Sequence, residues 1–101
     1  MATIYFTITG TKYFHGDKFL EPDMKVTLEK DLDNEYDAEA IKVTLPGLGA
    51  IGHVANSVAT RIGESQSAGR IYDKIGDKAE GKVLFVLPAG VLCELYVEEN
   101  K

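Results

Sequence analysis

The chain has 101 residues, of which 45% are hydrophobic and 27% are charged, a composition typical of one compact folded domain and unlike that of a disordered segment. Its formal net charge of −5 and sequence pI of about 4.9 argue against a protein that coats duplex DNA by neutralising many phosphates. No apolar run approaches the roughly 18 residues of a membrane span, so we expect a cytoplasmic protein with no membrane partner.

Six segments alternate apolar and polar residues and are rich in β-branched and aromatic types, a pattern that predicts β-strands. The first segment ends at Gly10. Turn-forming residues separate the third segment from the fourth (Pro46-Gly47-Leu48-Gly49) and the fifth from the sixth (Pro88-Ala89-Gly90), so each pair is expected to form a hairpin. The six segments are residues 3–9, 25–30, 40–45, 51–55, 81–87 and 91–97.

Polar residues after the fourth strand predict a first short helix. Asn56 or Ser57 can cap it by accepting hydrogen bonds from the exposed amides of a first turn, and Gly63 is a suitable stop. Residues 98–101 are expected to form a loose C-terminal tail. No internal repeat or linker divides the chain, so we interpret residues 1–101 as a single domain.

A second short helix is predicted to begin at Ser65 or Ser67 and to stop at Gly76. Ile71 and Ile75 are four residues apart, so they share one face of this helix, which we expect to pack inward. Six short strands with two short helices inserted predict a mainly β fold, built as a six-stranded, partly closed β-barrel.

Three apparent motifs lack the context that their chemistry requires. The glycines of residues 47–52 are spaced as in a dinucleotide site, but a strand follows them where a helix is needed. The acidic run of residues 29–39 leads into a segment without the glycine and the final acid of a calcium loop. His15, His53 and Cys93 are too few and too irregularly spaced for structural zinc. We therefore expect no cofactor, no metal and no catalytic activity.

A set of polar and aromatic residues occupies a strand exit, a turn and the next hairpin, which a small barrel can bring together. Tyrosine rings offer stacking surfaces to nucleobases, worth about 1–3 kcal/mol per base. Asp37 can accept a hydrogen bond from a terminal 3′-hydroxyl, whereas a 3′-phosphate would meet like charge there. Lys12 can hold an internal phosphate as a point charge. The set comprises Lys12, Tyr13, Asn34, Tyr36, Asp37 and His53.

Purely structural roles stay open for the same residues. Tyr13 and Tyr36 also fit the half-buried aromatic residues of a barrel rim, with their hydroxyls in water. Asp37 can cap its turn through nearby amides, and Asn34 supports a turn in either case. His53 is also compatible with an ordinary strand histidine.

Three segments together follow the pattern of one domain family. They are Gly10-Thr11-Lys12-Tyr13-Phe14-His15-Gly16, the run of residues 33–43 that begins Asp33-Asn34-Glu35-Tyr36-Asp37, and Ile51-Gly52-His53-Val54. In these segments the chain resembles the HIRAN family, small β domains that occur fused to helicases and nucleases and as free-standing bacterial proteins. The resemblance covers roughly residues 10–95 and is strongest over residues 10–56. It implies an OB-like barrel of six strands with two helices.

The resemblance also implies a function and a role for each residue of the set. The function is capture of the 3′-hydroxyl end of single-stranded DNA, in a DNA repair or processing context. Tyr13 and Tyr36 would stack on or pack beside the terminal bases, and Asp37 would accept from the 3′-hydroxyl. Asn34 would hydrogen-bond in the pocket, and His53 would contact a backbone phosphate.

Three positions depart from the family pattern and remove affinity for a polyanion. Lys12 stands where an arginine is expected, Phe14 replaces a tyrosine, and Asn56 replaces a phosphate-contacting lysine. Together with the net charge of −5, these changes predict either DNA binding that is weak and salt-sensitive or a bound terminus that is not DNA. The alternative is a protein-interaction module that recruits a partner, such as a helicase or nuclease, through the barrel edge or the helical region 58–75.

Overall fold

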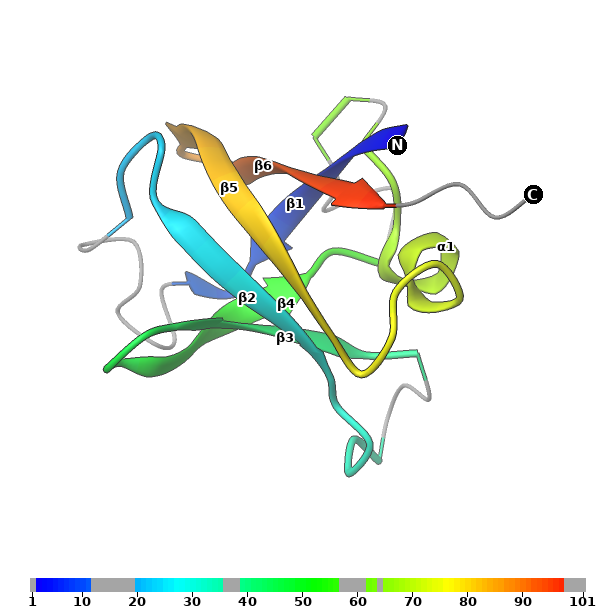
Figure 1. Ribbon diagram of the computed structural model, residues 1–101. Helices are drawn as coiled ribbons and strands as arrows, with labels where there is room; N and C mark the ends of the chain where they lie inside the picture. The colour runs from blue at the N-terminus through cyan, green and yellow to red at the C-terminus, as the bar shows by residue number, and fades with distance from the viewer. Residues whose placement is uncertain (1, 12–19, 36–38, 57–61, 64, 98–101) are drawn as a thin grey trace.

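The computed structural model describes residues 2–11, 20–35, 39–56, 62–63 and 65–97, and within them six antiparallel strands close into one barrel (Figure 1). The elements in chain order are β1 (Ala2–Thr9), β2 (Lys25–Lys30), β3 (Ile41–Leu45), β4 (Gly49–Val54), α1 (Ala68–Tyr72), β5 (Lys78–Leu87) and β6 (Gly90–Val97). Around the barrel their order is β1-β4-β3-β2-β5-β6. The predicted mainly β fold and its six strands are confirmed. Closure is complete, not partial, because β1 pairs with both β4 and β6.

Alternation along the strands builds the core. In β3, Ile41, Val43 and Leu45 are buried while Lys42 and Thr44 face outward and stay partly exposed. The other strands direct apolar side chains to the same interior, where α1 adds Ala68 and Ile71, so the buried residues form one hydrophobic cluster. Fully burying a side chain of this kind stabilises the fold by about 1.5–3 kcal/mol.

Helix α1 begins where the sequence predicts and ends earlier. The Ser67 hydroxyl caps it, and Ile71 is fully buried against the barrel. The predicted stop at Gly76 is wrong, because the helix ends at Tyr72. There the Lys74 amide donates to the Ile71 carbonyl at 2.8 Å, and such a three-residue hydrogen bond closes a tight turn in place of a further helical turn.

Two predictions fall outside the described part of the chain. The first helix depends on residues 57–61, and the loose tail comprises residues 98–101. Of the helical structure that is described, nothing is long and apolar enough to cross a membrane.

A β-bulge between β3 and β4 turns one side chain to the outside. The register shifts between Val43 and Thr44 of β3, so Ile51 is an extra residue on β4. Residues two apart on a regular strand share a face. Here Ile51 is fully buried, whereas the His53 side chain is 35% exposed. The bulge therefore gives His53 its outward direction, as bulges next to functional sites often do.

The barrel can close between β1 and β4 because residue 52 is a glycine, which has no side chain. A Cβ at this position would lie 2.6 Å from the Thr9 carbonyl oxygen and 2.7 Å from the Ile8 side chain. Only two residue pairs, Ile8 with Val54 and Thr9 with His53, join β1 to β4. A larger residue at position 52 would push these strands apart at the point where the sheet closes.

Gly81 makes a similar space on the other side of the barrel. It pairs with Val26 of β2 and Leu95 of β6, both of which are buried. A Cβ at Gly81 would lie 2.9 Å from the Glu94 carbonyl oxygen and 3.0 Å from two ring carbons of Phe6. Phe6 is fully buried, so its ring fills the volume that the glycine leaves.

We predict that Gly81→Ala lowers the free energy of unfolding by about 1–3 kcal/mol, because the added methyl overpacks the site of Phe6. Each kcal/mol corresponds to a fall in Tm of roughly 4–8 °C for a domain of this size. Gly76→Ala is the matched control, because a Cβ there meets nothing within 4 Å. Thermal unfolding followed by circular dichroism checks both variants, and an unchanged Tm for Gly81→Ala would contradict this account of the core.

Candidate functional site

Two of the six predicted site residues belong to the described part of the chain. Asn34 lies half-buried in the turn after β2, and His53 lies near the end of β4. The other four lie outside the described residues: Lys12, Tyr13, Tyr36 and Asp37.

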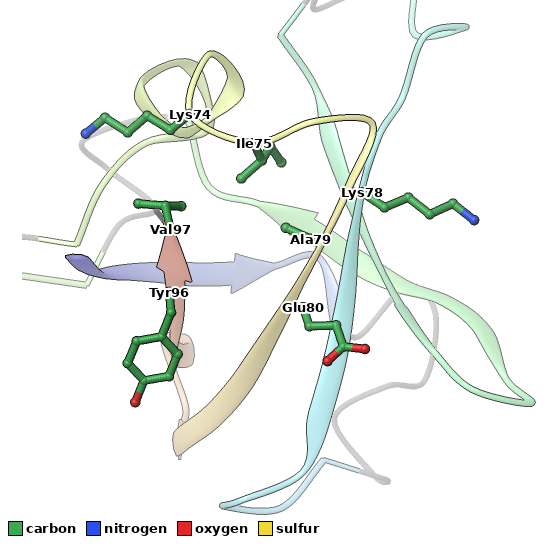
Figure 2. Close-up of a pocket in the computed structure, with 7 residues that line it drawn as sticks. All are labelled: Lys74, Ile75, Lys78, Ala79, Glu80, Tyr96 and Val97. Carbon is green, nitrogen blue, oxygen red and sulfur yellow. The ribbon is translucent and has the colours of Figure 1, made fainter. Parts of the chain in front are cut away.

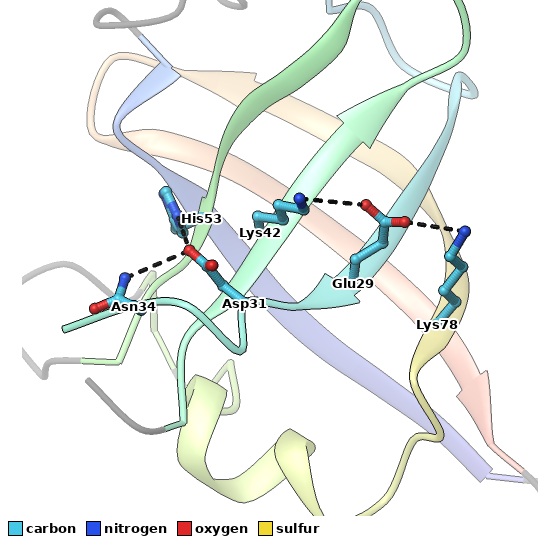
Figure 3. A network of polar contacts seen from close by, with 6 residues as sticks. All are labelled: Glu29, Asp31, Asn34, Lys42, His53 and Lys78. Atoms are coloured by element: carbon cyan, nitrogen blue, oxygen red, sulfur yellow. Dashed lines mark hydrogen bonds and ion pairs between the residues drawn. The ribbon is translucent and has the colours of Figure 1, made fainter. Parts of the chain in front are cut away.

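Asp31 joins the two described residues into one cluster. The Asn34 side-chain amide donates to Asp31 Oδ2 at 3.5 Å, and His53 Nε2 lies 3.6 Å from the same oxygen (Figure 3). The Asn34 backbone amide also donates to the Asp31 carbonyl, at 3.3 Å. The turn after β2 thus holds its polar side chains against β4. We call Asp31, Asn34 and His53 the Asp31 cluster.

The Asp31 cluster is partly exposed to solvent. Its contacts of 3.5–3.6 Å are at the long end of the range for hydrogen bonds and ion pairs. The side chains of His53 and Asp31 are 35% and 25% exposed, and Asn34 is half-buried. The Asp31 carboxylate thus lies next to the amide and the imidazole at a surface that is partly open to solvent.

His53 belongs to a row of cross-strand partners on the outer surface of the barrel. It pairs with Thr9 of β1 and with Lys42 of β3. Lys42 in turn pairs with Glu29 of β2, which pairs with Lys78 of β5. Glu29 lies 3.8 Å from the Lys42 ammonium and 3.1 Å from that of Lys78 (Figure 3). Lys42 and Lys78 are 40% and 69% exposed, and ion pairs at the surface contribute little to stability.

The described residues next to two of the predicted segments lie near the end of β4 or in the Asp31 cluster. Thr11, which precedes Lys12, is buried, and its methyl lies 3.4 Å from the position of a Cβ on Gly52. On the other side, Asn34 is separated from Tyr36 by a single residue. The chain therefore enters residues 12–19 and residues 36–38 from the same region of the barrel, around β4.

Asn56 has a structural partner. Its side-chain oxygen accepts a hydrogen bond from the Gly69 amide at 2.8 Å, and a Cβ on Gly69 would lie 3.3 Å from that oxygen. The residue that stands where the family pattern has a phosphate-contacting lysine therefore ties the end of β4 to the start of α1.

Sequence reasoning did not assign a site role to Asp31. It occurs within an acidic run, and no local pattern distinguishes it from Asp33 or Glu35. Its role depends on the turn that brings Asn34 back and on the bulge that turns His53 outward. Among the described residues, no group of three or more His, Cys, Asp or Glu side chains is arranged to hold a metal ion.

Comparisons with known proteins agree with this fold. The HIRAN domain model matches residues 1–99. The structure is similar to that of the HIRAN domain of human HLTF, with a TM-score of 0.64 and 21% identity over 97% of this chain and 78% of that chain. It is also similar to a protein from Lactobacillus plantarum, with a TM-score of 0.58 and 21% identity over 94% of this chain and 98% of that chain. No curated protein matches the chain. The chain belongs to the HIRAN domain family.

Proposed function

We propose that this chain is a DNA-binding module that captures the 3′-hydroxyl end of single-stranded DNA. It has no catalysis of its own and serves DNA repair or processing in the cytoplasm, alone or with a helicase or nuclease partner. The observation that carries the proposal is the convergence of Asn34 and His53 on Asp31 Oδ2. Membership of the HIRAN family supports it, because the matching segments include both residues.

In this proposal the Asp31 cluster forms one wall of the end-binding site. His53 donates to a phosphate of the last nucleotides, and Asn34 hydrogen-bonds to a base or to the pocket. Lys42, whose side chain is 40% exposed beside His53 in the row, supplies a cation for a second phosphate. Each neutralised phosphate contributes about 0.7 to the slope of log affinity against log salt concentration. A site with so few cations therefore binds weakly, and its affinity falls further as salt rises, with a shallow slope.

The segments attached to this wall complete the site. Tyr13 and Tyr36 stack on the terminal bases, an interaction worth about 1–3 kcal/mol per base. Asp37 accepts a hydrogen bond from the 3′-hydroxyl and repels a 3′-phosphate by like charge. Lys12 holds an internal phosphate. An end-specific site needs this combination of stacking surface and carboxylate.

The structure favours this function over recruitment of a partner through a barrel edge. Every described strand has a neighbour on both sides, so the barrel offers no edge of those strands to an added strand. In the described part of the helical region, Ala68 and Ile71 of α1 are buried, and Ile75 beyond the helix also packs in the core, so these apolar side chains are already occupied.

The preference for a 3′-hydroxyl is the first test. Wild-type protein should bind a short single strand ending in 3′-hydroxyl about ten-fold or more tightly than the same strand ending in 3′-phosphate, since a hydrogen bond to a charged group is worth about 1.5–3 kcal/mol. Asp37→Ala should abolish this preference and retain the Tm of the wild type. Fluorescence anisotropy at low and moderate salt measures both affinities. Equal affinity of the wild type for the two strands would refute end capture.

The role of the Asp31 cluster in binding is tested with the same two DNA strands, one ending in 3′-hydroxyl and one in 3′-phosphate. His53→Ala should lower affinity for each by the same factor of about two to ten, because it removes one hydrogen bond of about 0.5–1.5 kcal/mol to a phosphate that the strands share. Asp33→Asn is the matched control, since it removes the same charge from an exposed position of the same turn. Its affinity should equal or exceed that of the wild type. A loss as large as that of His53→Ala would contradict a specific role for the Asp31 cluster.

A further inference from the structure

A groove between the start of β5 and the end of β6 gathers several charged and aromatic side chains. It has a volume of about 530 Å³; Ile75, Ala79 and Val97 form its apolar floor, and Lys74, Lys78, Glu80 and Tyr96 line its sides. Figure 2 shows Lys74 and Lys78 extending to either side and the Tyr96 ring standing away from β6. A smaller hollow that shares Glu80 and Tyr96 continues it to further side chains, Lys25, Lys82 and Glu94. We call the two together the lysine groove.

The lysine groove has a charge opposite to that of the chain as a whole. It holds four lysines and two glutamates, whereas the chain carries 11 basic and 16 acidic residues. One of the glutamates, Glu94, is only 12% exposed and lies 3.6 Å from the Lys82 ammonium. The exposed charge of the groove is therefore mainly positive, which attracts anions.

Two of the lysines are placed directly opposite each other. Lys25 of β2 and Lys82 of β5 are cross-strand partners, and like charges in this position destabilise a sheet. Glu94 offsets the charge of Lys82 alone, through an ion pair on the side away from Lys25. An anion bound between the two ammonium groups would relieve their repulsion, so this pair points to an anionic ligand.

Tyr96 adds an exposed aromatic ring to the lysines. The residue is 55% exposed, and its hydroxyl donates to Glu94 Oε1 at 3.0 Å. This hydrogen bond and the negative charge of Glu94 raise the pKa of Tyr96 above its usual value, so the phenol stays neutral at physiological pH. Tyr5 of β1, 49% exposed, pairs with Glu94 from the other side. Exposed rings beside cations favour nucleic acid over an acidic peptide, because every base has a face that can stack.

The lysine groove also connects to the Asp31 cluster. Lys78 lines the groove and is the last member of the row that contains His53. Three inter-strand spacings of about 4.8 Å separate the two residues along the barrel surface, which gives a path of about 14 Å. Lys42 lies on this path. Glu29 also lies on it, between Lys42 and Lys78 and paired with both. A DNA strand whose end is held at the Asp31 cluster can thus reach the groove along this row if its phosphates follow the two lysines.

We propose that the lysine groove binds internal nucleotides of single-stranded nucleic acid, with Lys25 and Lys82 on phosphates and Tyr96 stacked on a base. The identity of the ligand rests on the proposed function, since it is the body of the strand whose end the Asp31 cluster captures. The interactions themselves require no end. The groove therefore extends the binding site from a terminus to the adjoining strand and adds the affinity that the acidic end site lacks.

Circular single-stranded DNA separates the groove from the end site, because it has no terminus. Wild-type protein should bind it at low salt, and the double variant Lys25→Ala/Lys82→Ala should bind at least about ten-fold more weakly. The double variant should also reduce the slope of log affinity against log salt concentration by about 1.4, since each phosphate that a lysine neutralises contributes about 0.7.

The aromatic ring is tested with the same circular DNA. Tyr96→Ala should lower affinity for the circle about five-fold or more, and Tyr96→Phe, which keeps the ring, should not.

Three outcomes would overturn the proposal. The first is no binding of the circle by the wild type, and the second is binding that the double lysine variant leaves unchanged. In both cases a retained preference for linear 3′-hydroxyl strands would show that end capture stands without the groove. The third is competition by polyglutamate at equal charge together with no effect of Tyr96→Ala, which would assign the groove to an acidic protein segment. The double variant removes a like-charge pair but also the ion pair of Lys82 with Glu94, so its Tm is measured beside its affinity. Lys25→Ala alone leaves that ion pair in place and should weaken binding of the circle without lowering the Tm.

Discussion

The close approach of β1 to β4 over Gly52 is the constraint on which the site depends. A Cβ on residue 52 would lie 2.6 Å from the Thr9 carbonyl oxygen. Only two residue pairs form the ladder between β1 and β4. One of those pairs contains His53. A side chain at position 52 would separate the strands, open the barrel and release the histidine from its neighbour, so the backbone of the closure and the candidate ligand-binding surface cannot vary independently.

Closure alone does not make the Asp31 cluster, which requires two further local features. The bulge at Ile51 inverts the alternation of β4 and turns His53 to the surface. The turn after β2 then brings Asp31 and Asn34 against it. The bulge interrupts regular strand pairing, and the turn leaves the regular sheet. Both lie beside polar groups that face solvent. Irregular backbone is thus concentrated where the protein presents its candidate binding groups.

The sequence predicts those parts of the fold that local patterns determine. Alternation identifies the six strands, and the cap at Ser67 marks the start of α1. Strict alternation, however, would place His53 on the same face as Ile51, and nothing local indicates the extra residue. The contact of Asp31 with His53, like the pairing of two lysines in the groove, depends on register between strands distant in sequence. The roles of the other site residues stay predictions: Lys12, Tyr13, Tyr36 and Asp37.

Backbone amide chemical shifts would test the central claim most directly, because they report on the whole surface at once. A ¹⁵N-labelled protein would be titrated to saturation with a short single strand that ends in 3′-hydroxyl. The account predicts the largest shifts at Thr11, Asn34, Gly52 and His53, with smaller shifts along the lysine groove. The same strand ending in 3′-phosphate should reduce the first group of shifts and leave those of the groove. Saturation by the 3′-hydroxyl strand without shifts around Asp31 would contradict end capture at this site.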